Sequence, residues 1–197
     1  EARRDGVPTL NRFFGKGLGI GKAKLITANN VVANVNDLDT FMEAIVELLA
    51  DDGIFVFESF YLGDVVKNMV FDFIYHEHLS AFSIKPIKRL MERYGMSLYM
   101  VEHLPTKGGS IRYYCNRYYV GRLKDSMNLV EDDDGPEHGS LYESQTYVNF
   151  GKRIDMEREK TRAILAKAKA QGKTIAGFGA SISATTLIYH FGLGEYI

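Results

Sequence analysis

The stretch LITANNVVANVNDLDTFMEAIVELLADDGIFVFE, residues 25–58, decides the fold class. An apolar run at 25–28 predicts a strand, and apolar residues at helical spacing predict a helix that begins near Asn36-Asp37 and runs through Ala50. Asp51-Asp52-Gly53 is expected to end this helix. The nearly all-apolar run at 54–58 is typical of a strand covered on both faces. A strand, a helix and a strand within about thirty residues indicate a βαβ unit with parallel strands.

The following residues predict an antiparallel addition to this sheet. A helix is expected over 85–94, with Pro86 in its first turn and Gly95 as its stop. Strands are expected over 97–104 and 110–117, joined by a turn. Paired antiparallel, they would make a mixed sheet, which is a recurring solution in α/β domains.

The last third of the chain predicts a separate unit. The acidic, turn-forming segment 131–136 is interpreted as a solvated linker, in preference to a metal site. A long helix is expected over 137–170, then a strand over 173–177 and a second helix to His190. This pattern resembles the start of a Rossmann-like unit, although one strand alone cannot bury its sheet face.

We therefore divide the chain into three parts. Residues 1–130 are expected to be the later part of a sheet domain, residues 131–170 an acidic linker and helix, and residues 171–197 the beginning of a C-terminal Rossmann-like domain. Both ends resemble cuts, since the chain opens without methionine and stops just after a strand-to-helix unit. Sequence missing on both sides is expected.

Composition excludes several classes of function. The 197 residues include 24 Lys plus Arg against 25 Asp plus Glu, so bulk charge gives no support for nucleic-acid binding. One cysteine, Cys115, excludes an internal disulfide framework and a multi-cysteine zinc site, and its apolar surroundings favour a buried, inert thiol. No apolar stretch is long enough to span a bilayer and no signal peptide is apparent, so a soluble cytoplasmic protein is the default expectation.

Tyr75-His76-Glu77-His78 is the strongest local signal for chemistry. An imidazole titrates near neutral pH, which suits a general base that removes a proton from carbon next to a carbonyl. A neighbouring carboxylate can fix its tautomer, and a phenol can hydrogen-bond a developing enolate. His-x-His also resembles half of a metal-ligand set, but no second His or Cys set with ligand spacing exists. Two partly exposed histidines beside a core aromatic explain the cluster equally well on residue types alone.

Two strand ends are expected to lie beside this cluster. Ala28, Asn29 and Asn30 end the first strand and Glu58 ends the second, and ligands of open α/β sheets lie beyond the carboxyl ends of the strands. These residues therefore predict one shared site. The alternative is that Asn29 and Asn30 only form a turn and a cap.

Two glycine-containing turns are weaker candidates. Gly177 and Gly179 lie between a strand-like run and a helix, the context of a phosphate loop, but Ile182 stands where a third glycine would fall. Tight strand-to-helix packing explains that loop as well. The turn Lys107-Gly108-Gly109-Ser110, with Arg112, could hold a phosphate or sugar hydroxyl through backbone N–H groups, or be an ordinary turn.

Taken in order, these pieces carry a family resemblance. The motifs are ANNV at 28–31, FVFE at 55–58, FDFIYHEHLS at 71–80, GGSIR at 108–112 and GFGAS at 177–181. The chain resembles the SAM-dependent C-methyltransferase family of nucleotide-deoxysugar pathways over nearly its whole length. The resemblance implies a class I, Rossmann-like methyltransferase domain, followed by a second Rossmann-like domain. It also implies an N-terminal zinc-binding domain and a glycine-rich SAM loop, neither of which is in this sequence.

The resemblance assigns roles residue by residue. His78 corresponds to the proposed base, and Tyr75 and Glu77 to groups that contact the substrate or its enolate. S-adenosyl-L-methionine would lie against Ala28, Asn29 and Asn30, and no metal is expected. A nucleotide-linked sugar is the expected partner. Its binding residues are expected to be His76, Gly108, Gly109, Ser110, Arg112, Gly177 and Gly179.

Two departures and several alternatives stay open. Lys107 stands where the family commonly has histidine, which leaves the substrate's identity open, and Ser183 stands where a basic residue is usual. A SAM-dependent enzyme of another small acceptor, oxygen or nitrogen included, is the alternative within methyltransferases. A nicotinamide-dependent oxidoreductase built on the Gly177 loop and a non-catalytic copy are the alternatives outside them. The chain by itself is expected to be inactive, and its oligomeric state is left open.

Overall fold

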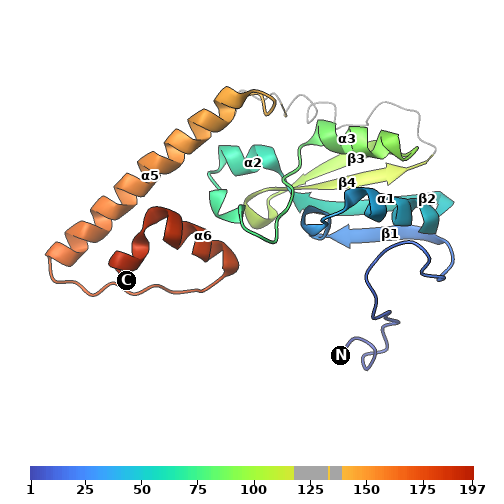
Figure 1. Cartoon of the computed structure of the whole chain (residues 1–197), viewed down its shortest axis with the longest axis horizontal. Coiled ribbons are helices and arrows are strands. Elements are labelled where there is room, and N and C mark those ends of the chain that lie inside the picture. Colours follow the sequence, from blue (N-terminus) through green and yellow to red (C-terminus); the bar gives the residue numbers. More distant parts are fainter. Residues whose placement is uncertain (118–132, 134–138) are drawn as a thin grey trace.

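A four-stranded mixed sheet forms the centre of the computed structural model, which describes residues 1–117, 133 and 139–197 (Figure 1). The strand order is β1-β2-β4-β3. β1 and β2 are parallel, while β4 is antiparallel to both β2 and β3. The predicted βαβ unit and the antiparallel addition are therefore confirmed. The strands are β1 (Ala23–Asn29), β2 (Leu49–Phe60), β3 (Ser97–Leu104) and β4 (Ser110–Asn116).

Helix α1 (Leu38–Leu48) connects the two parallel strands. It begins as predicted, because the Asp37 side chain accepts a hydrogen bond from the backbone N–H of Thr40. Its expected end at Ala50 is wrong. Leu49 is fully buried and already belongs to β2, whose pairing with β1 is irregular between Ala23 and Leu25. Burial of the Leu49 side chain on the sheet therefore prevails over the helical spacing.

Helix α3 (Ile84–Arg93) confirms its predicted position. Gly95 has a φ of 67°, and its N–H donates to the carbonyl of Glu92. The N–H of Met96 donates to the carbonyl of Met91. These two bonds form a Schellman motif, so the glycine ends the helix as expected.

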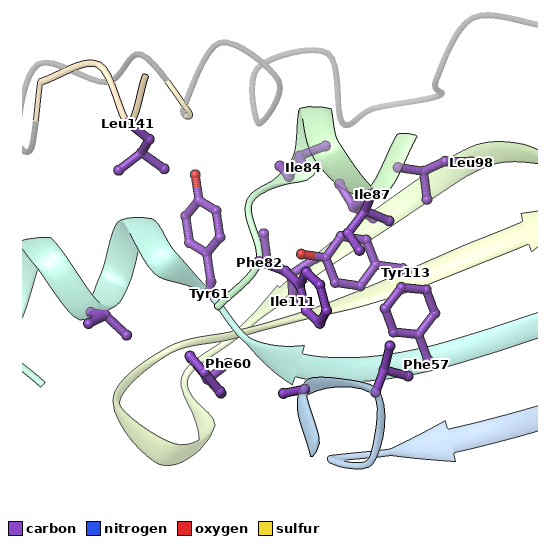
Figure 2. Packing of buried hydrophobic residues seen from close by; sticks show 14 of the residues in the cluster. Phe57, Phe60, Tyr61, Phe82, Ile84, Ile87, Leu98, Ile111, Tyr113 and Leu141 are labelled. Carbon is purple, nitrogen blue, oxygen red and sulfur yellow. The ribbon is translucent and has the colours of Figure 1, made fainter. Parts of the chain in front are cut away.

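The core lies on one face of the sheet, under α1 and α3. Phe57 stacks on Tyr113 with ring centroids 4.6 Å apart, and both side chains are fully buried (Figure 2). Cys115 is buried beside them, and burial raises the pKa of its thiol, which confirms the expected inert thiol. Ile54 and Val56, on the opposite face, are only half-buried. The prediction that this strand is covered on both faces is therefore wrong for the part of the chain that the structure describes.

The C-terminal residues form a helical arm. It consists of α5 (Ser144–Ala170), which extends away from the sheet, and α6 (Ile182–Phe191) (Figure 1). The long helix was predicted to begin at residue 137. Residues 139–143 are not helical, so this prediction is wrong there, and residues 137 and 138 lie outside the described part. The strand expected over 173–177 is also wrong, because residues 173–180 form neither helix nor strand. No described strand lies beside them to pair their backbone groups.

The acidic segment has one described residue, and that residue is buried. Asp133 is fully buried, whereas the rest of 131–136 lies outside the described residues. Its carboxylate accepts hydrogen bonds from the hydroxyls of Tyr61 at 2.8 Å and Tyr142 at 2.6 Å. It also accepts from the backbone N–H groups of Ile84 and Lys85. The prediction of a solvated linker is therefore wrong at Asp133. Its carboxylate caps the N-terminus of α3 and connects this helix to the end of β2.

The hydroxyl of Tyr61 points towards the segment that carries Leu141 (Figure 2). This hydroxyl donates its hydrogen bond to Asp133. Tyr61 directly follows β2 and precedes α2 (Leu62–Lys67). None of the helices that the structure describes is long and apolar enough to cross a lipid bilayer.

Candidate functional site at the edge of the sheet

The carboxyl ends of β1 and β2 lie at one edge of the sheet, where Asn29 pairs with Glu58. The N–H of Asn30 donates to the carbonyl of Glu58. The segment after the histidine cluster reaches the same edge, because the N–H groups of Leu79 and Ser80 both donate to the carbonyl of Ala33. The predicted convergence of the two strand ends with the histidine cluster is therefore present in the structure.

The hydrogen-bond partners of its two ring nitrogens hold His78 in one tautomer. Nδ1 lies 2.7 Å from the carbonyl oxygen of Phe73, which can only accept a hydrogen bond, so Nδ1 carries the proton. Nε2 then carries the lone pair, and it lies 3.2 Å from the hydroxyl of Tyr75. In the neutral ring the phenol donates and Nε2 accepts. Nε2 is thus the basic atom of the cluster.

Aromatic side chains fix the plane of this imidazole. The His78 ring lies 4.7 Å from Phe60, at the end of β2, and 5.7 Å from Phe73. The Tyr75 ring is closer still, with centroids 4.2 Å apart. Burial raises the pKa of Tyr75, and the charges of Glu77 and Asp72 raise this pKa further. The phenol therefore keeps its proton at neutral pH and remains a hydrogen-bond donor.

The other two members of the cluster are more open. His76 and Glu77 are exposed, whereas Tyr75 and His78 are half-buried. The cluster is thus divided into a packed pair and an exposed pair, which residue types alone did not separate. Among the described residues, no three His, Cys, Asp or Glu side chains gather in a way that could hold a metal ion.

The β1 end offers a polar surface beside this pair. Asn29 is exposed and Ala28 is half-buried. Asn30 has a left-handed backbone, with a φ of 54°, which asparagine tolerates better than most residues. An exposed amide beside a small side chain fits a ligand that carries hydroxyl and amino groups, as a nucleoside does.

The glycine turn lies at the same edge, but its donors are already engaged within the chain. The N–H of Gly109 and the hydroxyl of Ser110 donate to the carbonyl of Thr106. Arg112 forms ion pairs with Glu58 at 3.0 Å and Glu102 at 3.2 Å. These groups therefore have partners within the chain, and binding of a phosphate or a sugar hydroxyl by this turn stays a prediction. Gly108 has a φ of 83° and accepts, through its carbonyl, a hydrogen bond from Asn68.

The sequence did not reveal a hydrogen-bonded pair of a histidine and a carboxylate at this edge. Nε2 of His103 lies 2.5 Å from the carboxylate of Asp64, which is buried in α2. A Cβ on Gly109 would overlap the same carboxyl group, so Asp64 requires glycine at that position. The predicted pairing of 97–104 with 110–117 could have located His103, since it places this residue opposite Ile111 at the sheet edge.

The C-terminal loop reaches the cluster only through the helix that follows it. Phe178 is fully exposed between Gly177 and Gly179. No hydrogen bond in the described part of the chain joins either glycine to Tyr75 or His78. Helix α6 does make contact, because the hydroxyl of Thr186 donates to the carbonyl of Ile74.

Known protein families match almost the whole chain. A family model described as "Methyltransferase domain" matches residues 5–101, and one described as "C-methyltransferase C-terminal domain" matches residues 105–197. C-methyltransferase NovU of Streptomyces niveus is 32% identical over 179 residues, which are 89% of this chain and 41% of that protein. The chain thus spans about two fifths of the length of this curated relative.

Solved structures with a similar chain path include two that are described with SAM or its product. The structure of LepI in complex with SAM has a TM-score of 0.46 and 11% identity, covering 56% of this chain and 30% of that one. Magnesium protoporphyrin IX methyltransferase (ChlM) from Synechocystis, with bound SAH, has a TM-score of 0.38 and 14% identity, covering 49% and 46%.

The mixed sheet and the methyltransferase-domain match confirm the predicted α/β, Rossmann-like class I methyltransferase fold. The C-terminal match extends over α5 and α6 to the last residue. The two models follow one another along the chain and the curated relative is also a C-methyltransferase, so the chain is similar to SAM-dependent C-methyltransferases over almost its whole length.

Proposed function

We propose that the protein carrying this chain transfers a methyl group from SAM to a carbon adjacent to the keto group of a nucleotide-linked deoxysugar. The match to the C-methyltransferase C-terminal domain and the similarity to a curated C-methyltransferase support carbon as the acceptor. The motif resemblance set out above supports the sugar. The observation that carries the chemistry is the paired geometry of Tyr75 and His78.

In this proposal His78 is the general base. Its Nε2 takes the proton from the carbon beside the keto group, and the electrons of the broken C–H bond move towards the keto oxygen. The Nδ1–H of the ring donates to the carbonyl of Phe73 in the neutral and in the protonated state, so the ring keeps its orientation during the transfer. The same carbonyl stabilises the imidazolium once it has formed.

Tyr75 is the proposed donor to the developing enolate oxygen: in the proposal its hydroxyl turns from Nε2 to the keto oxygen when the substrate binds, which leaves the Nε2 lone pair to take the proton. The substrate's acidic hydrogen and its keto oxygen are on adjacent atoms, and the two side chains that would address them are 3.2 Å apart. The raised pKa of the phenol suits this role, because a protonated hydroxyl stabilises negative charge by donating. Glu77 and His76, which are exposed, are proposed to contact the substrate from the solvent side.

The β1 end is the proposed cofactor surface. Ala28, Asn29 and Asn30 lie at the same sheet edge as His78, and the exposed amide of Asn29 suits ribose hydroxyls. When bound, SAM supplies an electrophilic methyl group for the carbanion-like carbon. The Gly177–Gly179 loop is proposed, from the resemblance alone, to contact the substrate, and the turn at Gly109 to shape the edge.

Methyl transfer by the full-length protein tests this proposal. The protein would be given SAM with a carbon-13 methyl group and a panel of nucleotide-linked keto sugars and their reduced alcohols. The expected result is label on a carbon beside the keto group and none on the alcohols, which lack the acidic hydrogen. Label on oxygen or nitrogen would overturn carbon methylation. Transfer to keto compounds without a nucleotide, at equal rate, would overturn the proposed substrate class.

A further inference from the structure

Helix α6 of the C-terminal arm contacts the segment 71–78 just before its reactive side chains. The hydroxyl of Thr186 donates to the carbonyl oxygen of Ile74 at 3.2 Å, and Ile74 directly precedes Tyr75. Phe191 stacks on Phe71 with ring centroids 5.3 Å apart and an angle of 20° between the rings. α6 therefore holds this segment at a polar and an apolar point, which lie about one turn and a half apart along the helix.

Arg162 of α5 holds the C-terminal end of α6. Its guanidinium donates to the carbonyl oxygens of Phe191 at 3.0 Å and Gly192 at 3.2 Å, and it pairs with Glu195. The last carbonyls of a helix have no partner within the helix, so a cation there satisfies them and complements the helix dipole. Gly192 has a φ of 63°, and a Cβ at this position would overlap Arg162. The end of α6 is thus built around this side chain.

The contacted segment has little regular structure of its own. Its one helical turn is the 3-10 turn Phe71–Phe73. Beyond that turn, the hydrogen bonds of His78 to Phe73 and of Leu79 to Ala33 fix the residues after Tyr75. The carbonyl of Ile74 is therefore the point at which α6 fixes the backbone directly before Tyr75. A shift there moves the phenol relative to Nε2 of His78.

We propose that α6 is a positioning element for the reactive pair, with Thr186 and Arg162 as its positioning residues. This inference rests on the proposed function of Tyr75 and His78. Thr186 lies in the part of the chain matched by the C-terminal family model, whereas the reactive pair lies in the part matched by the methyltransferase-domain model. The C-terminal part thus contributes to the methyl-transfer site by setting its geometry, without contacting the reacting atoms.

The test compares three threonine variants of the full-length protein. Thr186→Val removes the hydroxyl and keeps the shape, and Thr186→Ser restores the hydroxyl. Thr185→Val is the matched control, since Thr185 is exposed on the same helix. Two quantities are measured: kcat and KM for methyl transfer, and amide hydrogen exchange of residues 74–78 without ligand.

Thr186→Val is expected to lower kcat roughly three- to tenfold, the effect of one lost hydrogen bond, and to leave the KM for SAM unchanged. Exchange at 74–78 is expected to become faster. Thr186→Ser is expected to restore both quantities, and Thr185→Val to change neither. Arg162→Ala is expected to change both in the same direction as Thr186→Val, through the loosened end of α6.

Wild-type kcat in Thr186→Val would overturn the positioning role, whatever the exchange shows. The two proposals fail separately. If His78→Ala retained methyl transfer, the function assigned to His78 would fall, while faster exchange in Thr186→Val would still establish the contact. If His78→Ala lost activity and Thr186→Val lost none, the positioning role alone would fall.

Discussion

The sheet region, residues 23–116, and the helical arm, residues 144–197, are stabilised in different ways. In the sheet region, strands distant in sequence pair with one another and bury a shared apolar core. In the arm, α5 buries only Thr146, Phe150 and Ile154 along 27 residues. A long helix satisfies its own backbone hydrogen bonds, whereas a strand cannot. This comparison explains why the helices of the arm form and its expected strand does not.

The two regions nevertheless share the candidate site. The reactive pair belongs to the sheet region, and α6 of the arm contacts the segment just before this pair. Substitutions in matched pairs can break or sharpen this comparison.

The largest effect is expected at His78. His78→Ala in the full-length protein should lower the rate of methyl transfer at least ~100-fold, because a general base contributes about that much. Lys173→Ala, in the exposed connection before α6, should leave the rate unchanged. Steady-state rates with labelled SAM measure both. A His78→Ala rate within threefold of wild type would contradict the assignment of catalysis to the Tyr75–His78 pair of the sheet region.

Two glycines with positive φ should differ in the free energy of unfolding. Gly109→Ala places a Cβ onto Asp64, at a φ of 128°, and should cost about 3 kcal/mol or more. Gly172→Ala, at the end of α5, meets nothing within 4 Å and should cost about 1–2 kcal/mol for the left-handed backbone alone. Urea unfolding of both variants measures the difference. Equal costs would show that the Asp64 contact does not constrain the turn.

Asp133 should be a strong link between α3 and the end of β2. Asp133→Ala removes the hydrogen bonds that the hydroxyl of Tyr61 and the N–H groups of Ile84 and Lys85 donate to this buried carboxylate, and should cost about 2–4 kcal/mol. Asp52→Ala is the control, since Asp52 pairs with Lys24 at the exposed surface and should change stability little. A thermal melt in which the two variants behaved alike would contradict the buried role of Asp133.

The smallest effects are expected at two helix caps. Asp37 caps α1 in the sheet region and Ser181 caps α6 in the arm, each through a side chain that accepts a backbone N–H. Alanine at either position should lower the melting temperature slightly. Hydrogen bonds from Thr40 lower the pKa of Asp37 below its ordinary value of 3.8. The contribution of Asp37 is therefore fully present above that value and lost as the pH falls through the lowered pKa of the folded state.

The pH dependence separates the two caps. The difference in melting temperature between wild type and Asp37→Ala should vanish in acid, whereas the difference for Ser181→Ala should not change with pH, because serine does not titrate there. A pH-independent effect of Asp37→Ala would contradict the proposed role of its charge.

Patterns with local causes were predicted well. The cap at Asp37, the stop at Gly95 and the strand limits of β3 follow from residue types within a few positions. The boundary between α1 and β2 was misplaced, because burial of Leu49 on the sheet depends on tertiary packing. For the same reason Asp133 was taken for a solvated residue, since its partners Tyr61 and Ile84 are distant in sequence.

The sequence predicted which strand ends share one edge of the sheet, and it did not predict how the side chains at that edge are arranged. The sequence indicated that Asn29, Glu58 and His78 would lie together, and the register of β1 with β2 confirms the shared edge. The tautomer of His78 depends on the carbonyl of Phe73, which no side-chain motif reveals. Arg112 was expected to face a ligand, but it pairs with Glu58 and Glu102 across neighbouring strands. Backbone acceptors and cross-strand partners become visible only when the register is known.

Solvent hydrogen exchange tests the central claim most directly, because it isolates proton removal from methyl transfer. The full-length protein would be incubated in D2O with S-adenosylhomocysteine and the keto sugar that it methylates, and deuterium at the carbon beside the keto group would be followed by NMR. Wild-type protein should incorporate deuterium at that carbon, Tyr75→Phe should do so more slowly, and His78→Ala should not exceed the uncatalysed rate. Deuterium incorporation by His78→Ala at the wild-type rate would contradict the assignment of Nε2 as the base.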